Sequence, residues 1–97
     1  NEADMLNRIV FGQSASEWKQ QNPALATSGK NQRDYSSAGQ LMMLANLESL
    51  NSHLIANGIS QNDRIIQLAR EAKRQYQTFV DIDNITQQNI KRLNHEN

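Results

Sequence analysis

The sequence contains no cysteine, a single proline and no long hydrophobic run. Without cysteine, disulfides, thiolate metal sites and cysteine nucleophiles are excluded, and so are the small secreted domains that depend on disulfides. The longest nearly apolar stretch, residues 40–47, is less than half of the about 20 residues that a membrane helix needs. We therefore expect a protein of a reducing compartment, the cytoplasm, with no membrane partner.

The chain also lacks an excess of either charge, since ten Lys and Arg balance ten Asp and Glu. Modules that bind nucleic acid or a membrane surface usually carry a basic excess. Hydrophobic residues make up 37% of the 97 positions, which is below the usual value of about 45%. This composition predicts one domain over residues 1–97, with a thin core that a partner completes. Because the first residue is Asn1 rather than Met, we expect a piece of a longer protein.

Hydrophobic residues recur at helical spacing along most of the chain, and no segment alternates as a β-strand does. Helices are predicted at residues 2–11, from Ser14 through Trp18, at 37–57 and at 61–80. After Asp81 the apolar content is thin, so this part is expected either to form a fifth helix that docks on a partner or to fray. The predicted fold is an all-α, compact bundle of four to five helices with one long loop at about residues 22–36.

Three helix starts carry capping signals. Ser14 with Glu17, and Ser37 with Gln40, form the capping box, in which each side chain satisfies a free backbone N–H group of the first turn. Ser60 is expected to cap the helix that follows, with Asp63 at its third position.

Two apolar stripes are predicted to form the core. In the 37–57 helix the stripe consists of Met43, Leu47, Leu50 and Leu54, flanked by Leu41, Leu44 and Ile55. In the 61–80 helix it consists of Ile65, Ala69, Ala72, Tyr76 and Phe79. The first helix has the longer and broader stripe and is predicted to be the central one.

The residues that carry chemistry are few. His53 lies near serines at 49 and 52, but no third group is available to orient it as a catalytic base, and His95 lies in the predicted tail. Asp81 and Asp83 lack the glycine and the distal glutamate of a calcium loop, and we interpret them as carboxylates that open a helix. We therefore predict that the chain is not an enzyme and binds no metal or cofactor.

The predicted loop holds the first group of candidate contact residues, Lys30, Asn31, Arg33 and Tyr35. Together they offer positive charge, an amide and an aromatic ring, which can bind a phosphate or stack on a base. The same residues also have a structural interpretation, because loop arginines and tyrosines commonly attach a loop to its own domain.

The second candidate group is the basic face of the 61–80 helix, where Arg70 and Arg74 accompany Arg64 and Lys73. Such a row can contact the phosphate backbone of DNA. A solvated helix face is the alternative interpretation, because acidic residues are interspersed.

Residues 2–66 contain a series of different short motifs in a fixed order. They are Glu2-Ala3-Asp4-Met5-Leu6-Asn7, Phe11-Gly12, Ser16-Glu17-Trp18, Asn22-Pro23, Asn31-Gln32-Arg33-Asp34-Tyr35, Gln40-Leu41 and Leu44-Ala45-Asn46-Leu47-Glu48-Ser49-Leu50-Asn51, followed by Gly58 and Arg64. In order and spacing they resemble the helical region C-terminal to the KilA-N domain in phage and bacterial KilA-N-domain proteins. The resemblance implies a parent protein whose upstream KilA-N domain is a DNA-binding module, in a bacterium or a phage-infected host. That domain's DNA-contacting residues have no counterparts in this chain.

The sequence thus favours a non-catalytic accessory helical module that self-associates or binds a protein partner, with DNA bound through the upstream domain of the parent protein. The alternative is direct nucleic-acid binding, either through the Lys30–Tyr35 loop or through the basic face of the 61–80 helix.

Overall fold

A computed structural model describes residues 1–96 of the chain and contains five α-helices, one 3-10 helix and, within that range, no β-strand. The elements are α1 (Glu2–Phe11), α2 (Ala15–Gln21), α3 (Pro23–Thr27), η1 (Gln32–Tyr35), α4 (Ala38–Ala56) and α5 (Gln61–Glu96). The prediction of an all-α bundle is confirmed. Among the described residues, no helix is both long enough and apolar enough to span a membrane.

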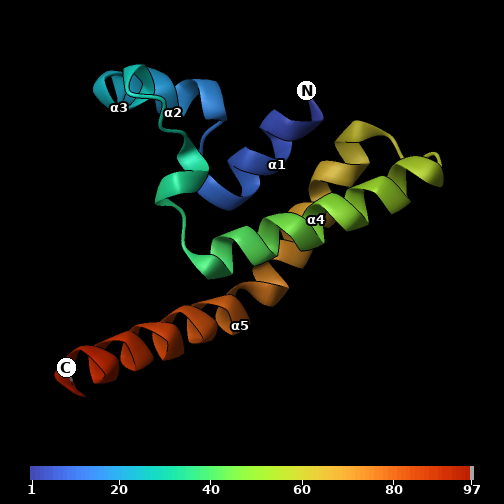
Figure 1. Cartoon of the computed structure of the whole chain (residues 1–97). Helices are drawn as coiled ribbons and strands as arrows, with labels where there is room; N and C mark the ends of the chain where they lie inside the picture. Colours follow the sequence, from blue (N-terminus) through green and yellow to red (C-terminus); the bar gives the residue numbers. More distant parts are fainter. Residues whose placement is uncertain (97) are drawn as a thin grey trace.

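The helices form a small body from which the end of α5 projects (Figure 1). Helix α4 crosses the first half of α5, and α1 packs against both helices. Helices α2 and α3 and the 3-10 helix η1 form a separate layer beside α1. The C-terminal part of α5 leaves the body, and the molecule measures 54 × 33 × 17 Å.

The core lies where α1, α4 and α5 meet, and its two most deeply buried side chains are Leu47 and Leu68. Its other buried hydrophobic residues are Met5, Leu6, Met43, Leu44, Leu54, Ala72 and Phe79. The predicted role of α4 as the central helix fits this arrangement, because Met43, Leu47 and Leu54 of its stripe are buried and Leu50 is half-buried.

The predicted stripe of α5 is wrong in part. Ala72 and Phe79 are buried, but Ile65, Ala69 and Tyr76 are exposed. The face that α4 covers runs through Leu68, which the predicted stripe omitted. Both stripes fit helical periodicity, so only the direction from which α4 approaches decides between them.

Capping at the start of α4 is as predicted. The Ser37 hydroxyl accepts a hydrogen bond from the Gln40 amide at 3.1 Å, and the Ser37 amide donates to the Gln40 side chain at 2.9 Å. Ser14 accepts from the Glu17 amide at 3.1 Å, but the Glu17 carboxylate accepts from Arg8 at 2.9 Å, so only half of the predicted capping box forms there. Ser60 accepts from the Asp63 amide at 3.4 Å. Local sequence therefore fixes these three helix starts.

The prediction of one long loop at residues 22–36 is wrong, because this segment contains α3 and η1. Pro23 occupies the first turn of α3, where its missing N–H group is not needed. Asn31 caps η1 by accepting from the Arg33 amide at 3.0 Å, and the Asn31 amide donates to Asp34 at 2.8 Å. The buried Gln32 side chain donates to the Gln13 carbonyl, which attaches the segment to the body.

The predicted helix boundary at Asp81 is also wrong, because α5 runs without a break from Gln61 to Glu96. This segment contains no glycine or proline that would end a helix. The Gln77 side chain donates to Asp81 one turn later, at 2.9 Å, which is a bond within a continuing helix. Of the predicted tail at residues 82–97, Asn97 lies outside the described residues.

Candidate interaction surface

A polar network in the body joins α1, α4 and α5, and Arg64 is at its centre. The Arg64 guanidinium donates to Glu2 at 2.7 Å, to Asn51 at 3.0 Å and to the Ile59 carbonyl at 2.6 Å. Asn51 in turn donates to Glu2 at 2.9 Å. The hydrogen bond from Asn51, followed by that from Arg64, lowers the pKa of Glu2 below its usual value. These bonds fix how α1 sits on the two longer helices.

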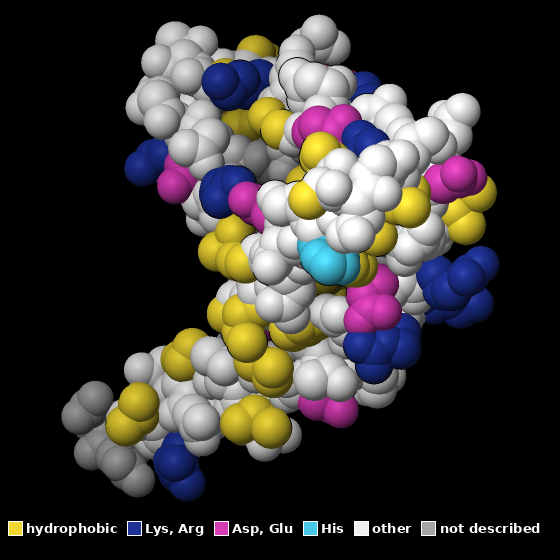
Figure 2. All heavy atoms as spheres, turned by 90° about the vertical axis from the view of Figure 1, so that its right-hand side faces the viewer, with side chains coloured by type: hydrophobic (Ala, Val, Ile, Leu, Met, Phe, Trp, Pro, Cys, Tyr) yellow, Lys and Arg dark blue, Asp and Glu magenta, His cyan; other side chains and the backbone are white. Residues whose placement is uncertain are grey.

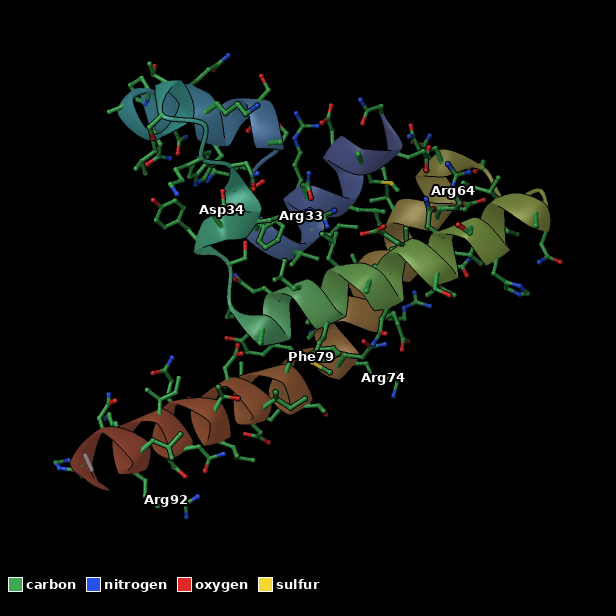
Figure 3. The ribbon with its side chains drawn as sticks, viewed as in Figure 1. Arg33, Asp34, Arg64, Arg74, Phe79 and Arg92 are labelled. Atoms are coloured by element: carbon green, nitrogen blue, oxygen red, sulfur yellow. The ribbon has the colours of Figure 1, made fainter. Side chains whose placement is uncertain are left out.

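Because of these hydrogen bonds, Arg64 is not part of an exposed basic face of α5. Its side chain is 10% exposed and is pointed into the body, where its guanidinium is satisfied by protein groups (Figure 3). Interpreting Arg64 as part of a DNA-contacting face is therefore wrong. Helical spacing already separates it from Arg70, since Arg64 lies four residues before the buried Leu68 and therefore on the same side of α5.

A second junction joins the start of α4 to the middle of α5. The carboxylate of Asp83 accepts from the Ser37 hydroxyl and from the Gly39 amide, both at 2.7 Å. Asp83 thus satisfies a free N–H group in the first turn of α4, where a negative charge is favourable. The interpretation of Asp81 and Asp83 as residues that open a helix is wrong: both lie inside α5, and Asp83 stabilises the start of a different helix.

Gly39 allows this close crossing. A Cβ atom at this position would lie 2.6 Å from the Phe79 carbonyl oxygen and 2.7 Å from an Asp83 carboxylate oxygen. Both separations are shorter than van der Waals contact, so a larger residue would push α4 and α5 apart.

The candidate residues of the 22–36 segment are held by local contacts. Tyr35 stacks on the buried Trp18, with ring centroids 5.9 Å apart, although 56% of Tyr35 remains exposed. The Arg33 guanidinium lies 3.6 Å from a carboxylate oxygen of Glu48 in α4. Asn31 caps η1. Lys30 is exposed in the turn that precedes η1. The side chains of Asn31, Arg33 and Tyr35 therefore have contacts within the chain, and Lys30 contributes its backbone amide, which donates to the Leu25 carbonyl at 2.9 Å.

Arg70 and Arg74 lie on the exposed side of α5. Arg74 pairs with Glu71 one turn earlier, and this pairing lowers the pKa of Glu71 to about 2. Arg33 and Arg74 lie on different elements and on opposite sides of α4 in the view of Figure 3. The two candidate groups do not form one continuous surface around these residues.

His53 is exposed on α4, and its ring lies 3.4 Å from the Asn57 side chain. Within the part of the chain that the structure describes, no group of three or more His, Cys, Asp or Glu residues is placed to hold a metal ion.

An apolar groove of about 490 Å³ lies between α1, α4 and α5. Its lining consists of Ile9, Val10, Gly39, Gln40, Met43, Ala69, Ala72, Lys73, Tyr76, Phe79, Val80 and Asp83. The groove therefore ends at the crossing of α4 and α5, where the projecting part of α5 begins. Neither the groove nor its continuity with that segment was predicted from the sequence.

The projecting part of α5, residues 84–96, forms an arm, and we use that word for this segment. Three large hydrophobic side chains on it are exposed: Ile85 at 57%, Ile90 at 44% and Leu93 at 57%. Hydrophobic side chains are visible along the arm at the lower left of Figure 2. The arm is helical, and no other described element covers it.

Sequence reasoning assigned no interhelical role to Asn51 or Asp83, although a signal for both was present. Asn51 lies four residues after Leu47 and three before Leu54, which places an amide in the apolar stripe of α4. Asp83 likewise follows the buried Phe79 by four residues. A polar side chain at a core-facing position indicates a hydrogen-bond partner on a neighbouring helix.

No family model, no curated protein and no solved structure matches this chain.

Proposed function

We propose that this chain is a non-catalytic accessory module that assembles through the arm of α5 with another protein chain, in the first instance a second copy of itself. The observation that carries the proposal is that α5 has exposed large hydrophobic side chains beyond the body. Ile90 and Leu93 continue the side of α5 that Phe79 occupies, Ile85 lies beside it, and all three are exposed to solvent.

The energetics of helices support this proposal. A helical segment of this length is only marginally stable in water by itself, and most helices in proteins depend on burial of an apolar face. Burial of such a side chain from full exposure contributes roughly 1.5–3 kcal/mol, and because these three are already about half covered, each would add roughly half of that. A partner helix that covers the arm would supply this stabilisation, which the body does not.

The resemblance to the region C-terminal to KilA-N domains supports the place of the module in a larger protein. In that arrangement the upstream domain binds DNA in the cytoplasm, and this module brings two such domains together. Self-association suits this role, because two linked DNA-binding domains bind neighbouring sites more tightly than one does.

Direct nucleic-acid binding has less support. Arg64 is buried, Arg33 and Arg74 each have an acidic neighbour, and the chain has no net charge. The candidates Lys30, Asn31, Tyr35 and Arg70 therefore stay secondary to the arm.

The proposal is tested by light scattering of the purified chain across a concentration series, compared with an Ile85→Ser/Leu93→Ser double variant. We expect the average mass of the unchanged chain to rise with concentration and the double variant to stay monomeric. Ile66→Ser is a matched control, because Ile66 is 56% exposed on the part of α5 that lies within the body.

A chain that stays monomeric at every concentration would overturn self-association. Retention of DNA at low salt, lost on Arg70→Ala/Arg74→Ala substitution, would instead support the nucleic-acid alternative.

A further inference from the structure

The charges of the arm and its base are separated along the helix axis. Asp81 and Asp83 lie at the base, Lys91 and Arg92 lie near the tip, and residues 84–90 between them are uncharged. Figure 3 shows Arg92 close to the C-terminal end of α5, far from the crossing with α4 at Phe79. Glu96 offsets one of these two positive charges, so the exposed helix has two acidic residues at its base and a net charge of plus one over residues 91–96.

The face of α5 that packs in the body can be followed into the arm, where it alternates hydrophobic and polar residues. Starting from the buried Phe79, steps of three and four residues lead to Ile82, Thr86, Asn89 and Leu93. Ile85 and Ile90 lie on the two flanks of this row. Alternation of three and four residues is the spacing by which two helices pack along a seam.

Given the assembly function proposed above, we propose that the arms of two copies pair side by side in antiparallel orientation. In this pairing Ile82 of each copy lies level with Leu93 of the other. Thr86 then lies level with Asn89 at the centre, and Arg92 approaches the acidic base of the other copy, beside Asp81.

Charge complementarity selects both the occupant and the orientation. In an antiparallel pair of arms, the basic tip of each copy lies beside the acidic base of the other copy. A parallel pair would set Arg92 beside Arg92 and Asp81 beside Asp81, and it would also align the two helix dipoles unfavourably. The body of each copy then lies at the opposite end of the pair.

The size of the arm sets the strength of the pairing. Residues 84–96 span about 20 Å at about 1.5 Å per residue, which is short for a two-helix seam. A dimer of moderate affinity that depends on concentration is therefore expected. Salt weakens the exposed ion pairs at its ends.

Single cysteines test the orientation, because the natural chain has none. We would prepare Thr86→Cys and Asn89→Cys, which alter exposed side chains outside the core, and oxidise each variant alone and then both together. A disulfide requires Cα atoms within about 7 Å, so it reports which positions face each other. We expect the mixture to form mainly the mixed 86–89 cross-link, identified by peptide mass, and each variant alone to form little.

Each other outcome has a distinct meaning. Efficient cross-linking of each variant with itself would overturn the antiparallel orientation and indicate a parallel pair. A dimer in light scattering without any cross-link at these positions would overturn pairing through the arm but leave self-association standing. A chain that is monomeric in light scattering and forms no cross-link would overturn both proposals.

A charge exchange supplies a second test. Arg92→Glu is expected to weaken the dimer up to about tenfold, because the symmetric pair contains this exposed ion pair twice. The Asp81→Lys/Arg92→Glu double variant restores complementarity and is expected to recover the original affinity. A double variant that associates more weakly than the single variant would contradict the antiparallel arrangement.

Discussion

The two parts of α5 share one helix and one side that carries leucines, yet they have opposite environments. Leu68 in the first part is fully buried beneath α4, whereas Leu93 in the arm is 57% exposed. Both leucines satisfy the same spacing in the sequence. The comparison teaches that periodicity identifies a face that can be buried, while the neighbouring elements decide whether it is.

The largest expected effect comes from truncating one leucine in each part. Leu68→Ala removes a fully buried side chain and should lower the free energy of unfolding by about 3 kcal/mol, because a cavity remains. Leu93→Ala should change it by less than about 0.5 kcal/mol at low protein concentration. Urea denaturation followed by circular dichroism measures both.

Raising the protein concentration sharpens this comparison. If the arm is an interface, Leu93→Ala becomes destabilising relative to the unchanged chain as the concentration increases, since the dimer stabilises the folded state by mass action. Equal effects of the two substitutions at low concentration would show that the arm folds back onto the body.

The next effect concerns the crossing that separates the two parts of α5. Gly39→Ala places a methyl group against the Phe79 carbonyl and the Asp83 carboxylate. We expect a loss of about 1–2 kcal/mol, because the overpacking exceeds the gain in helix propensity. Thermal unfolding measures the loss, and an unchanged transition would mean that the crossing tolerates a shift of α4.

The smallest expected effect is a decrease of folding stability at low pH, which arises from residues in the body. Pairing with Arg74 lowers the pKa of Glu71 to about 2 from 4.5, and bonds from Asn51 and Arg64 lower that of Glu2. Because the pKa in the folded state lies below that of the unfolded chain, these carboxylates stabilise the fold above about pH 4.5. This stabilisation is lost as the pH falls toward 2.

Thermal unfolding at pH 6 and pH 2.5 measures the acid effect. Glu71→Gln should reduce the difference between the two transition temperatures, because it removes one of the three carboxylates with a lowered pKa, which are Glu2, Glu17 and Glu71. A chain that ends after Asn84 should keep the difference. Loss of the pH dependence on removal of the arm would contradict its assignment to the body.

Local signals predicted much of the fold. Spacing and capping residues gave α1 and α4 within a residue of their ends, since Ser37 and Gln40 satisfy the first turn whatever surrounds them. The same reasoning missed α3 and η1, whose short helical turns lack an apolar repeat. It also divided α5 at Asp81, because the decline in apolar content was taken as the end of a helix.

The candidate contact residues were harder to judge from the sequence. Arg64, Arg70 and Arg74 belong to one predicted basic group, but Arg64 lies four residues before the buried Leu68 on the same side of α5, where it meets Asn51 and Glu2 from other helices. The sequence contained the signal that Asn51 is a polar residue in an apolar row. It could not identify the two partners of Asn51, because Arg64 lies 13 residues after it and Glu2 lies 49 residues before it.

The sequence by itself determined the all-α class, the helix starts at Ser14, Ser37 and Ser60, and the absence of any cysteine chemistry, because these depend on residue identity and local hydrogen bonding. Only the tertiary structure decided that Asp83 stabilises α4 and that the arm stays uncovered. Both depend on the angle at which α4 crosses α5. That angle is set by packing between residues that are far apart in the chain.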